Sequence, residues 1–333
     1  MIAEISVGVG CELAHAAVSV SSNAFFRKTS LVYDLQWRSK VKRIYLDTNL
    51  WNLLCDQSVA ASKLLASLYS KHCSLVLSYQ VVFELAKCFP GLRKGVPERG
   101  AALFAYMREF VHRNIPCVTE LLEVLSEEMW ALKLDRPVNP FLPPEGYTAL
   151  GSNVDLLAGG KFDERAAAFV EERTALALRT RVGPIVQLGL RPDVKQRLSD
   201  IPDSEVGEWL RSETFTDRGA SLLAGHVRRQ FCEASPEDAR EWALGLLASP
   251  ICRLSRALVR ADLYYNWRCA KRGSNPSDLF DDMYHVLNAV YCDVYATRER
   301  RHAQYAGLLL AGDTRVAIYE AGTPVGDWIV SLA

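Results

Sequence analysis

Short apolar runs alternate with stretches of helical period over residues 43–134. Strand character marks 43–47 (RIYLD), 74–78 (SLVLS) and 115–119 (IPCVT), where β-branched, aromatic and leucine side chains are concentrated. Apolar residues at helical spacing predict helices over 58–71, 80–88, 98–112 and 120–132. This order of strands and helices is typical of a parallel sheet with helices on its faces, so the pattern predicts an α/β fold.

The alternation stops in the middle of the chain. Residues 136–151 are rich in proline and glycine, so we expect a loop there. The region that follows is poor in strand patterns. The sequence SPED at 235–238 is typical of a helix start, with a capping serine, a first-turn proline and early acids. We interpret about 135–275 as a helical insertion, with helices expected over 162–180, 217–232, 239–247 and 251–271.

The alternating pattern returns at Ser277. It predicts a helix over 278–291, a strand over 293–297 (DVYAT), a helix over 301–310 and a final strand over 315–320. The expected organisation is therefore an extension at 1–40, the first part of an α/β domain at 41–134, the helical insertion at 135–275 and the second part of the domain at 276–333. Residues 1–40 show no clear period, and we expect either a disordered lead or an extension upstream of the true start.

Composition narrows the class of protein. The chain has 333 residues, 49% of them hydrophobic, which is ample for a sizeable core. Basic and acidic residues balance at 39 each, so a polyanionic partner would have to meet a local basic patch. The nine cysteines include no C-x-x-C pair, which disfavours a zinc knuckle and indicates reduced thiols in a cytoplasmic protein. The sequence predicts no membrane segment.

Acidic residues fall where the predicted strands end. Asp47 closes the first strand, Glu84 lies one turn into the helix after the second, and Asp281 and Asp282 open the helix before DVYAT. Glu299 follows that strand. Ligands of open parallel sheets bind beyond the carboxyl ends of the strands, so we expect these acids to meet at one edge.

Carboxylates that crowd together repel one another, so such a cluster needs compensation. Hard cations such as Mg²⁺ or Mn²⁺ bind oxygen ligands and supply that compensation. Bound metals can activate water and stabilise the charge that grows on a phosphodiester. The pattern therefore indicates a metal site, and metal-bound water would be its nucleophile.

Three segments carry a family resemblance: YLDTNLWN at 45–52, LVLSYQVVFELAK at 75–87 and DDMYHVLNAVYCDVYATRE at 281–299. Together they resemble the PIN-domain nucleases, over about 41–92 and 277–320. The resemblance implies a PIN-like three-layer α/β/α fold with a central parallel sheet, interrupted here by the helical insertion. It also implies a metal-dependent nuclease that acts on RNA.

Carried over residue by residue, the resemblance implies a metal site made of Asp47, Glu84, Asp282 and Glu299. Asp282 is preferred to Asp281 because the family often shows D-x-x-H, which Asp282 and His285 match. The sequence departs from the usual T-x-D, since it has Thr297-Arg298-Glu299. Either the longer Glu299 reaches the metal or Asp293, before the strand, takes its place. The polar residues that match those orienting the first acid are Thr48 and Asn49.

Plainer interpretations accompany these assignments. Taken alone, LDTN is better explained as a turn or helix cap. Asp281 is explained as well by the positive end of its helix, and His285 by a hydrogen bond at the edge of the core. A haloacid-dehalogenase-like phosphatase also begins on a strand-end aspartate, but it needs a second aspartate where this chain has Asn49.

A basic stripe runs along the last helix of the insertion. Its members are Arg253, Arg256, Arg260, Arg268, Lys271 and Arg272, with Tyr264, Tyr265 and Trp267 among them. Basic and aromatic side chains together can follow a phosphate backbone and stack on bases. The plainer interpretation is a solvated helix face with partly buried aromatics.

From the sequence we expect a cytoplasmic, metal-dependent endoribonuclease with Mg²⁺ or Mn²⁺ as cofactor and single-stranded or structured RNA as partner. A protein partner or a homo-oligomer is compatible with the insertion. The alternative is a catalytically weak or inactive PIN-like domain that serves as a scaffold for RNA or protein. The glutamate at position 299 favours this alternative.

Overall fold

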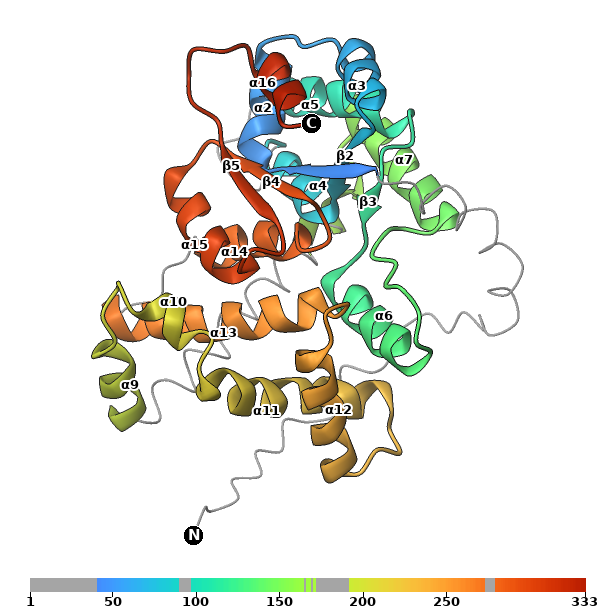
Figure 1. Cartoon of the computed structure of the whole chain (residues 1–333). Helices are drawn as coiled ribbons and strands as arrows, with labels where there is room; N and C mark the ends of the chain where they lie inside the picture. Colours follow the sequence, from blue (N-terminus) through green and yellow to red (C-terminus); the bar gives the residue numbers. More distant parts are fainter. Residues whose placement is uncertain (1–40, 90–96, 165, 169, 172–191, 273–278) are drawn as a thin grey trace. The chain divides into compact units, whose positions relative to one another are not determined.

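The computed structural model describes residues 41–89, 97–164, 166–168, 170–171, 192–272 and 279–333 (Figure 1). At 97, 192–194, 213–214, 272 and 280–281 it describes the backbone alone. Lys42–Ala333 belong to one compact unit, separate from the residues before them. The fold and the site described below belong to this unit.

Five parallel strands form one sheet in the order β3-β2-β1-β4-β5 (Figure 1). The neighbours of β1 are therefore β2 on one side and β4 on the other, and the strand order reverses at this point. In open parallel sheets such a switch point leaves a crevice beyond the carboxyl ends of the strands. The strands are β1 (Lys42–Leu46), β2 (Cys73–Ser78), β3 (Cys117–Val118), β4 (Val294–Thr297) and β5 (Arg315–Ile318).

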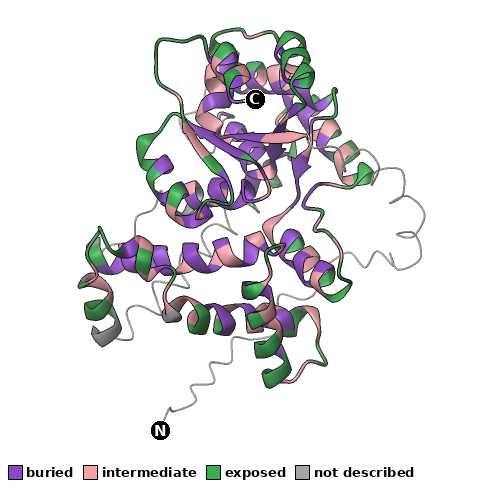
Figure 2. Cartoon of the chain, viewed as in Figure 1, coloured by how far each residue is buried: buried purple, intermediate pink, exposed green. Residues whose placement is uncertain are grey.

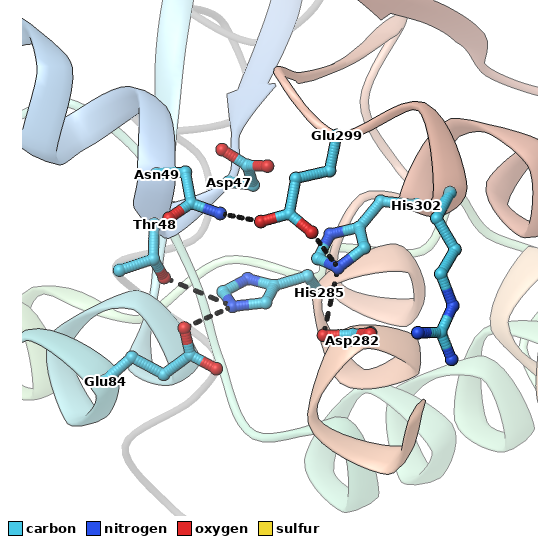
Figure 3. Close-up of a pocket in the computed structure, with 9 residues that line it drawn as sticks. Asp47, Thr48, Asn49, Glu84, Asp282, His285, Glu299 and His302 are labelled. Atoms are coloured by element: carbon cyan, nitrogen blue, oxygen red, sulfur yellow. Dashed lines mark hydrogen bonds and ion pairs between the residues drawn. The ribbon is translucent and has the colours of Figure 1, made fainter. Parts of the chain in front are cut away.

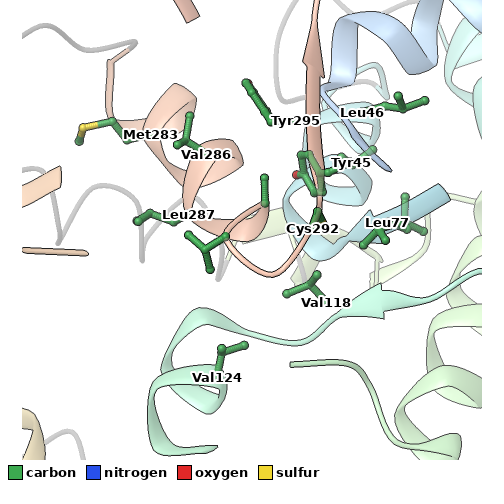
Figure 4. Packing of buried hydrophobic residues seen from close by; sticks show 14 of the residues in the cluster. Tyr45, Leu46, Leu77, Val118, Val124, Met283, Val286, Leu287, Cys292 and Tyr295 are labelled. Atoms are coloured by element: carbon green, nitrogen blue, oxygen red, sulfur yellow. The ribbon is translucent and has the colours of Figure 1, made fainter. Parts of the chain in front are cut away.

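The central strands are buried along most of their length, as expected for a parallel sheet that helices cover on both faces. All four residues of β4 are buried, and so are the last three of β1. Tyr45 pairs in register with Tyr295, and their rings stack at a centroid distance of 6.0 Å. Figure 4 shows both tyrosines packed among aliphatic side chains from β2 and α14. This core fixes the ends of β1 and β4 relative to each other.

Helices cover both faces of the sheet. In Figure 1, α2 (Thr48–Asp56), α3 (Ala61–Ser70) and α16 (Val325–Ser331) lie on one face, and α14 (Leu279–Asn288) and α15 (Arg300–Leu310) on the other. α4 (Tyr79–Ala86) contacts both α2 and α14. The protein is thus an α/β protein with a five-stranded, all-parallel sheet, which confirms the fold class expected from the strand and helix pattern. Its layers are compatible with a three-layer α/β/α arrangement.

The described helices from α6 (Leu121–Lys133) to α13 (Arg253–Arg272) are called the helical block below, and they belong to the same compact unit as the sheet. The longest of these described helices, α13, contacts α14 and α15. The buried Glu128 of α6 accepts hydrogen bonds from the Leu254 and Ser255 amides, at 2.6 and 2.8 Å. Glu128 thereby caps the first turn of α13 from another helix. Further helices in the described part of the chain are α5 (Pro97–Val111), α7 (Pro144–Ala158), α9 (Pro192–Ser199), α10 (Val206–Trp209), α11 (Glu213–Gln230) and α12 (Pro236–Ala248).

The loop expected over 136–151 is wrong in its second half, where α7 begins at Pro144. A proline is tolerated in the first helical turn because its missing N–H has no intrahelical partner there. Tyr147 anchors α7 by donating to the Ile115 carbonyl at 2.7 Å. Ser235 caps α12 as predicted, accepting from the Asp238 amide at 3.1 Å. The helix expected over 162–180 lies largely outside the described residues.

Burial follows the layers: Figure 2 shows purple residues where helices face the sheet or one another and green residues on the outward faces. Among the described helices, none is by itself long and apolar enough to cross a membrane. α12 and α13 meet that criterion only as a pair, across a bend of 99°.

Candidate functional site

An acidic pocket of about 220 Å³ lies at the carboxyl ends of β1 and β4, at the switch point of the sheet (Figure 3). All four acids implied by the resemblance line it, and they come from β1, α4, α14 and the turn after β4. The full lining is Asp47, Thr48, Asn49, Glu84, Asp282, His285, Glu299, Arg301 and His302. The structure thus brings together side chains that lie far apart in the sequence, as the hydrogen bond between Thr297 and Asp47, 250 residues apart, illustrates.

Asp47 is the deepest of the acids, with 1% of its surface exposed. Its Oδ1 accepts from the Leu50 amide at 2.9 Å, so it is the N-cap of α2. Its Oδ2 accepts from the Thr297 hydroxyl. Burial raises the pKa of Asp47, whereas these two hydrogen bonds favour the ionised form. Asp47 therefore both caps α2 and lines the pocket.

Glu84 is held by a buried histidine. Ser78 ends β2 and caps α4, which begins at the next residue and carries Glu84 into the pocket. Glu84 Oε2 lies 3.0 Å from His285 Nε2. Burial alone would raise the pKa of Glu84, but the charge and hydrogen bond of His285, helped by Thr48, lower it to about 2. Glu84 and His285 therefore form an ion pair inside the pocket.

His285 belongs to a chain of hydrogen bonds that begins behind the pocket. It is 2% exposed, and its Nδ1 lies 2.9 Å from the Tyr45 hydroxyl. That hydroxyl bonds Ser78 Oγ at 2.8 Å. Burial lowers the pKa of His285, but the adjacent Glu84 carboxylate outweighs burial and raises it. The plainer interpretation of a core-edge histidine is thus incomplete, because both ring nitrogens have partners and one faces the pocket.

His302 joins the other two acids. Its Nε2 lies 3.1 Å from Asp282 Oδ1 and 3.0 Å from Glu299 Oε2. Asn49 donates to the second oxygen of Glu299, so that side chain is held at both ends. Burial lowers the pKa of His302, but the hydrogen bond and charge of Asp282, followed by the charge of Glu299, raise it. The longer side chain at 299 therefore does reach the pocket.

His302 and Arg301 are the pocket residues that the sequence interpretation missed. The signal for His302 was present, since it follows Glu299 by three residues on the same face of α15. Arg301 lies beside it at the start of α15 and is exposed. A helix beginning at Arg300 places both of them in its first turn, next to the acid that precedes it.

Asp293 does not line the acidic pocket. The alternative in which it replaces Glu299 is therefore wrong, because the residue lies too far from the other acids. It precedes β4, at the opposite end of the strand from Thr297, and it accepts from the Arg43 amide at 2.7 Å. Four strand residues separate the two ends, or roughly 13 Å at about 3.3 Å per residue. The side chain of Asp281 lies outside the described residues.

The basic stripe on α13 also differs from the expectation. Arg256 pairs with Asp313 at 3.2 Å, and Arg260, only 9% exposed, donates to the Leu309 carbonyl. Lys271 donates to the Ser199 and Ile201 carbonyls at 3.1 Å. These groups tie α13 to its neighbours. The side chain of Arg272 lies outside the described residues.

The aromatic residues of that stripe are core residues. Tyr264, Tyr265 and Trp267 are buried, so they cannot stack on bases. Arg253 and Arg268 are half-buried, and the guanidinium of Arg268 lies 5.6 Å from the centre of the Trp267 ring. The described side chains of the stripe therefore do not form an open basic surface.

The acidic pocket has the ligand chemistry that Mg²⁺ and Mn²⁺ prefer, with four carboxylates facing one cavity. In this structure three of those carboxylates are paired with His285 or His302, and both oxygens of Asp47 accept hydrogen bonds. Within the described ranges, no group of three or more His, Cys, Asp or Glu side chains is arranged to hold a metal ion. The four carboxylates are suitable ligands for these metals. In the structure their negative charge is offset by the ion pairs with His285 and His302.

Comparison with family models, with curated proteins and with solved structures gives no match. The fold and the site define an α/β protein with an all-parallel five-stranded sheet and an acidic pocket at the carboxyl ends of β1 and β4.

Proposed function

We propose that the protein is a metal-dependent nuclease of the PIN-like type and that RNA is its substrate. The observation that carries the proposal is the convergence of Asp47, Glu84, Asp282 and Glu299 on one pocket. These acids come from four separate elements and meet at the switch point of the sheet, where ligands of parallel sheets bind. The choice of RNA rests on the family resemblance.

The four carboxylates would hold Mg²⁺ or Mn²⁺, which when bound supplies an activated water and stabilises charge on the phosphodiester. Thr297 and Asn49 hold Asp47 and Glu299 in place through the hydrogen bonds described above. His285 and His302 contribute positive charge that offsets the crowded acids. This preorganises the pocket before any cation enters.

The test is a cleavage assay on labelled single-stranded RNA and DNA with Mn²⁺. We expect wild-type protein to cleave RNA, and Asp47→Asn and Glu84→Gln to lose at least about a hundredfold in rate, since each removes one charged ligand of the proposed centre. Equal cleavage by wild type and both variants would show that the activity comes from elsewhere.

Asp293→Asn is the matched control. It removes one carboxylate charge as well, but just before β4, at the end of that strand away from the pocket. We expect it to cleave like the wild type. Loss of activity in Asp293→Asn equal to that in Asp47→Asn would contradict the placement of the site.

A second candidate is a PIN-like scaffold without catalysis, which binds RNA or protein. The pairing of the acids with two histidines favours it, together with the absence of a metal-holding group among the described residues. Calorimetry with Mn²⁺ separates the two candidates. A protein that neither binds Mn²⁺ nor cleaves RNA supports the scaffold, and metal binding lost in Asp47→Asn supports the nuclease.

A further inference from the structure

A second and larger cavity, of about 960 Å³, lies in the helical block between α6, α11 and α12. It shares no described residue with the acidic pocket, and its size is at the upper end of ligand pockets, roughly 300–1,000 Å³. We call it the α6–α12 groove. Its lining is Leu132, Lys133, Val227, Phe231, Cys232, Glu233, Ala234, Asp238, Glu241, Trp242 and Gly245.

The wall of the α6–α12 groove is aromatic. Phe231, at the end of α11, lies 5.1 Å from the Trp130 ring and 5.2 Å from the Trp242 ring. The Lys133 ammonium is 5.1 Å from the centres of both Trp130 and Phe231. The groove therefore already holds one ammonium near the Phe231 ring of its lining, at a distance typical of a cation–π contact.

Exposed apolar residues on α6 and α12 adjoin the lining of the groove. Trp130, whose ring packs on Phe231, is 37% exposed, Leu134, directly after Lys133, is 58% exposed, and Leu244, directly before Gly245, is 36% exposed. Folded proteins do expose single apolar side chains, but a concentration of them beside a cavity marks an interaction site. Tryptophan in such a position is typical of the anchors of protein interfaces.

Acidic and basic side chains line opposite sides of the α6–α12 groove. Glu233, Asp238 and Glu241 line the side formed by α12 and the turn before it, and all three are exposed. Lys133 lies on the α6 side, over the rings. A ligand that enters along α12 therefore meets three carboxylates beside the Phe231 and Trp242 rings. Basic side chains with apolar stems or neighbours complement both features.

We propose that the α6–α12 groove is a docking site for a basic amphipathic segment of a partner protein. Its large apolar side chains pack against Phe231 and Trp242, and its lysines or arginines pair with Glu233 and Glu241. The proposal stands on the groove and its charge, and it does not depend on the nuclease proposal.

The test uses the full chain and three short fluorescein-labelled peptides. The first alternates leucine or tryptophan with lysine or arginine at helical spacing. The second replaces the basic residues by glutamate, and the third replaces the apolar residues by serine. We expect fluorescence anisotropy to show binding of the first peptide alone. Failure of the first peptide to bind, or equal binding of the first and second, overturns the proposal.

Charge reversal locates the binding. We expect Glu233→Lys and Glu241→Lys each to weaken binding of the basic peptide roughly tenfold, as loss of a partner for a charged hydrogen bond does. Glu145→Lys changes the net charge equally from an exposed site on α7 outside the groove, so it should bind like the wild type. Equal weakening in all three variants would mean general attraction to the protein's charge and overturns the proposal.

Cys232 provides a readout independent of the variants. It is exposed and lines the groove. Its alkylation, followed by mass spectrometry of the Cys232 peptide, should slow at least severalfold when the basic peptide is bound. Unchanged alkylation at saturating peptide would place the peptide elsewhere and overturn the proposal.

Discussion

Asp47 has two roles at once, as the N-cap of α2 and as the innermost acid of the pocket. One carboxylate oxygen accepts a hydrogen bond from the Leu50 amide, and the other accepts one from the Thr297 hydroxyl. The choice between a cap and a functional acid, which the sequence leaves open, is therefore not exclusive at this residue. A suitable substitution at Asp47 can therefore remove its charge and keep its capping of α2.

Asp47→Asn should keep the stability of the fold while removing the charge. Asparagine is as good an N-cap as aspartate, and it relieves the cost of a buried carboxylate. Asp47→Ala loses the cap as well, which costs about 0.5–2 kcal/mol of unfolding free energy. Urea unfolding without metal measures both. A loss of stability in the asparagine variant equal to that in the alanine variant would contradict the capping role.

The Glu84–His285 pair should stabilise the metal-free fold most strongly between about pH 4.5 and 6.5. The pKa of Glu84 falls from 4.5 to about 2 in the fold, so its contribution is present above 4.5 and is lost as pH falls toward 2. The pKa of His285 is raised from 6.5, so its contribution is present below 6.5 and is lost as pH rises through the raised pKa. Urea midpoints of wild type and Glu84→Gln, compared in chelator across this range, measure the profile. A constant difference between them would contradict it.

Arg301 should act on substrate binding if the nuclease proposal holds. It is the exposed cation that lines a pocket of four acids, and a phosphodiester needs such a group to offset repulsion. We expect Arg301→Ala to raise KM for single-stranded RNA about tenfold, with a smaller change in kcat. Arg300→Ala is the control, since Arg300 is 81% exposed and pairs with Glu320. Equal effects of the two substitutions would assign the effect to general surface charge.

At the scale of elements, the strands of the sheet were predictable because each combines local apolar runs with nearby turn residues. α7 was not predicted, because proline and glycine in its first turns suggest a loop when the chain is considered locally. What makes it a helix is packing on α5 and the anchoring of Tyr147, which are tertiary effects. The cap of α13 is likewise invisible locally, since it comes from Glu128 on another helix.

Glu128 should be a main support of the helical block. It is fully buried and accepts from two α13 amides, the Ser255 hydroxyl and the Tyr291 hydroxyl. Glu128→Ala removes the acceptor of the two buried amides and of the Ser255 hydroxyl, while Tyr291 keeps the Ile251 carbonyl as an acceptor, so we expect a loss of at least about 2 kcal/mol of unfolding free energy. Glu127→Ala removes a partly exposed partner of Arg136 on the same helix and should cost about 1 kcal/mol or less. Equal losses would show that Glu128 does not support α13.

At the scale of the whole molecule, the topology of the sheet was a better guide to the acidic pocket than spacing along α13 was to a nucleic-acid surface. Topology brought Asp47 and Glu299 to one edge, because parallel strands end on the same side. The same rule excludes Asp293, which lies at the start of its strand. The expectation for the α13 stripe was wrong because α9 and α15 pack against that helix. Arg260 and the aromatic residues are buried as a result, which no local pattern reveals.

Mn²⁺ should stabilise the whole chain against unfolding if the acidic pocket binds it. A cation that binds only the folded state raises the unfolding free energy by about 2.7 kcal/mol at a hundred times its Kd. For a chain of this length that corresponds to a rise in Tm on the order of 5 °C. We expect Mn²⁺ to produce this rise in the wild type and in Asp293→Asn.

Asp47→Asn should lack most of the rise, since it loses the innermost ligand while its helix cap remains. The comparison therefore separates metal binding at the acidic pocket from a general effect of Mn²⁺ on the surface. Differential scanning calorimetry across a Mn²⁺ titration measures it. A wild type whose Tm does not move would mean that His285 and His302 already supply the charge the acids require, and the scaffold candidate would then account for the pocket better than the nuclease does.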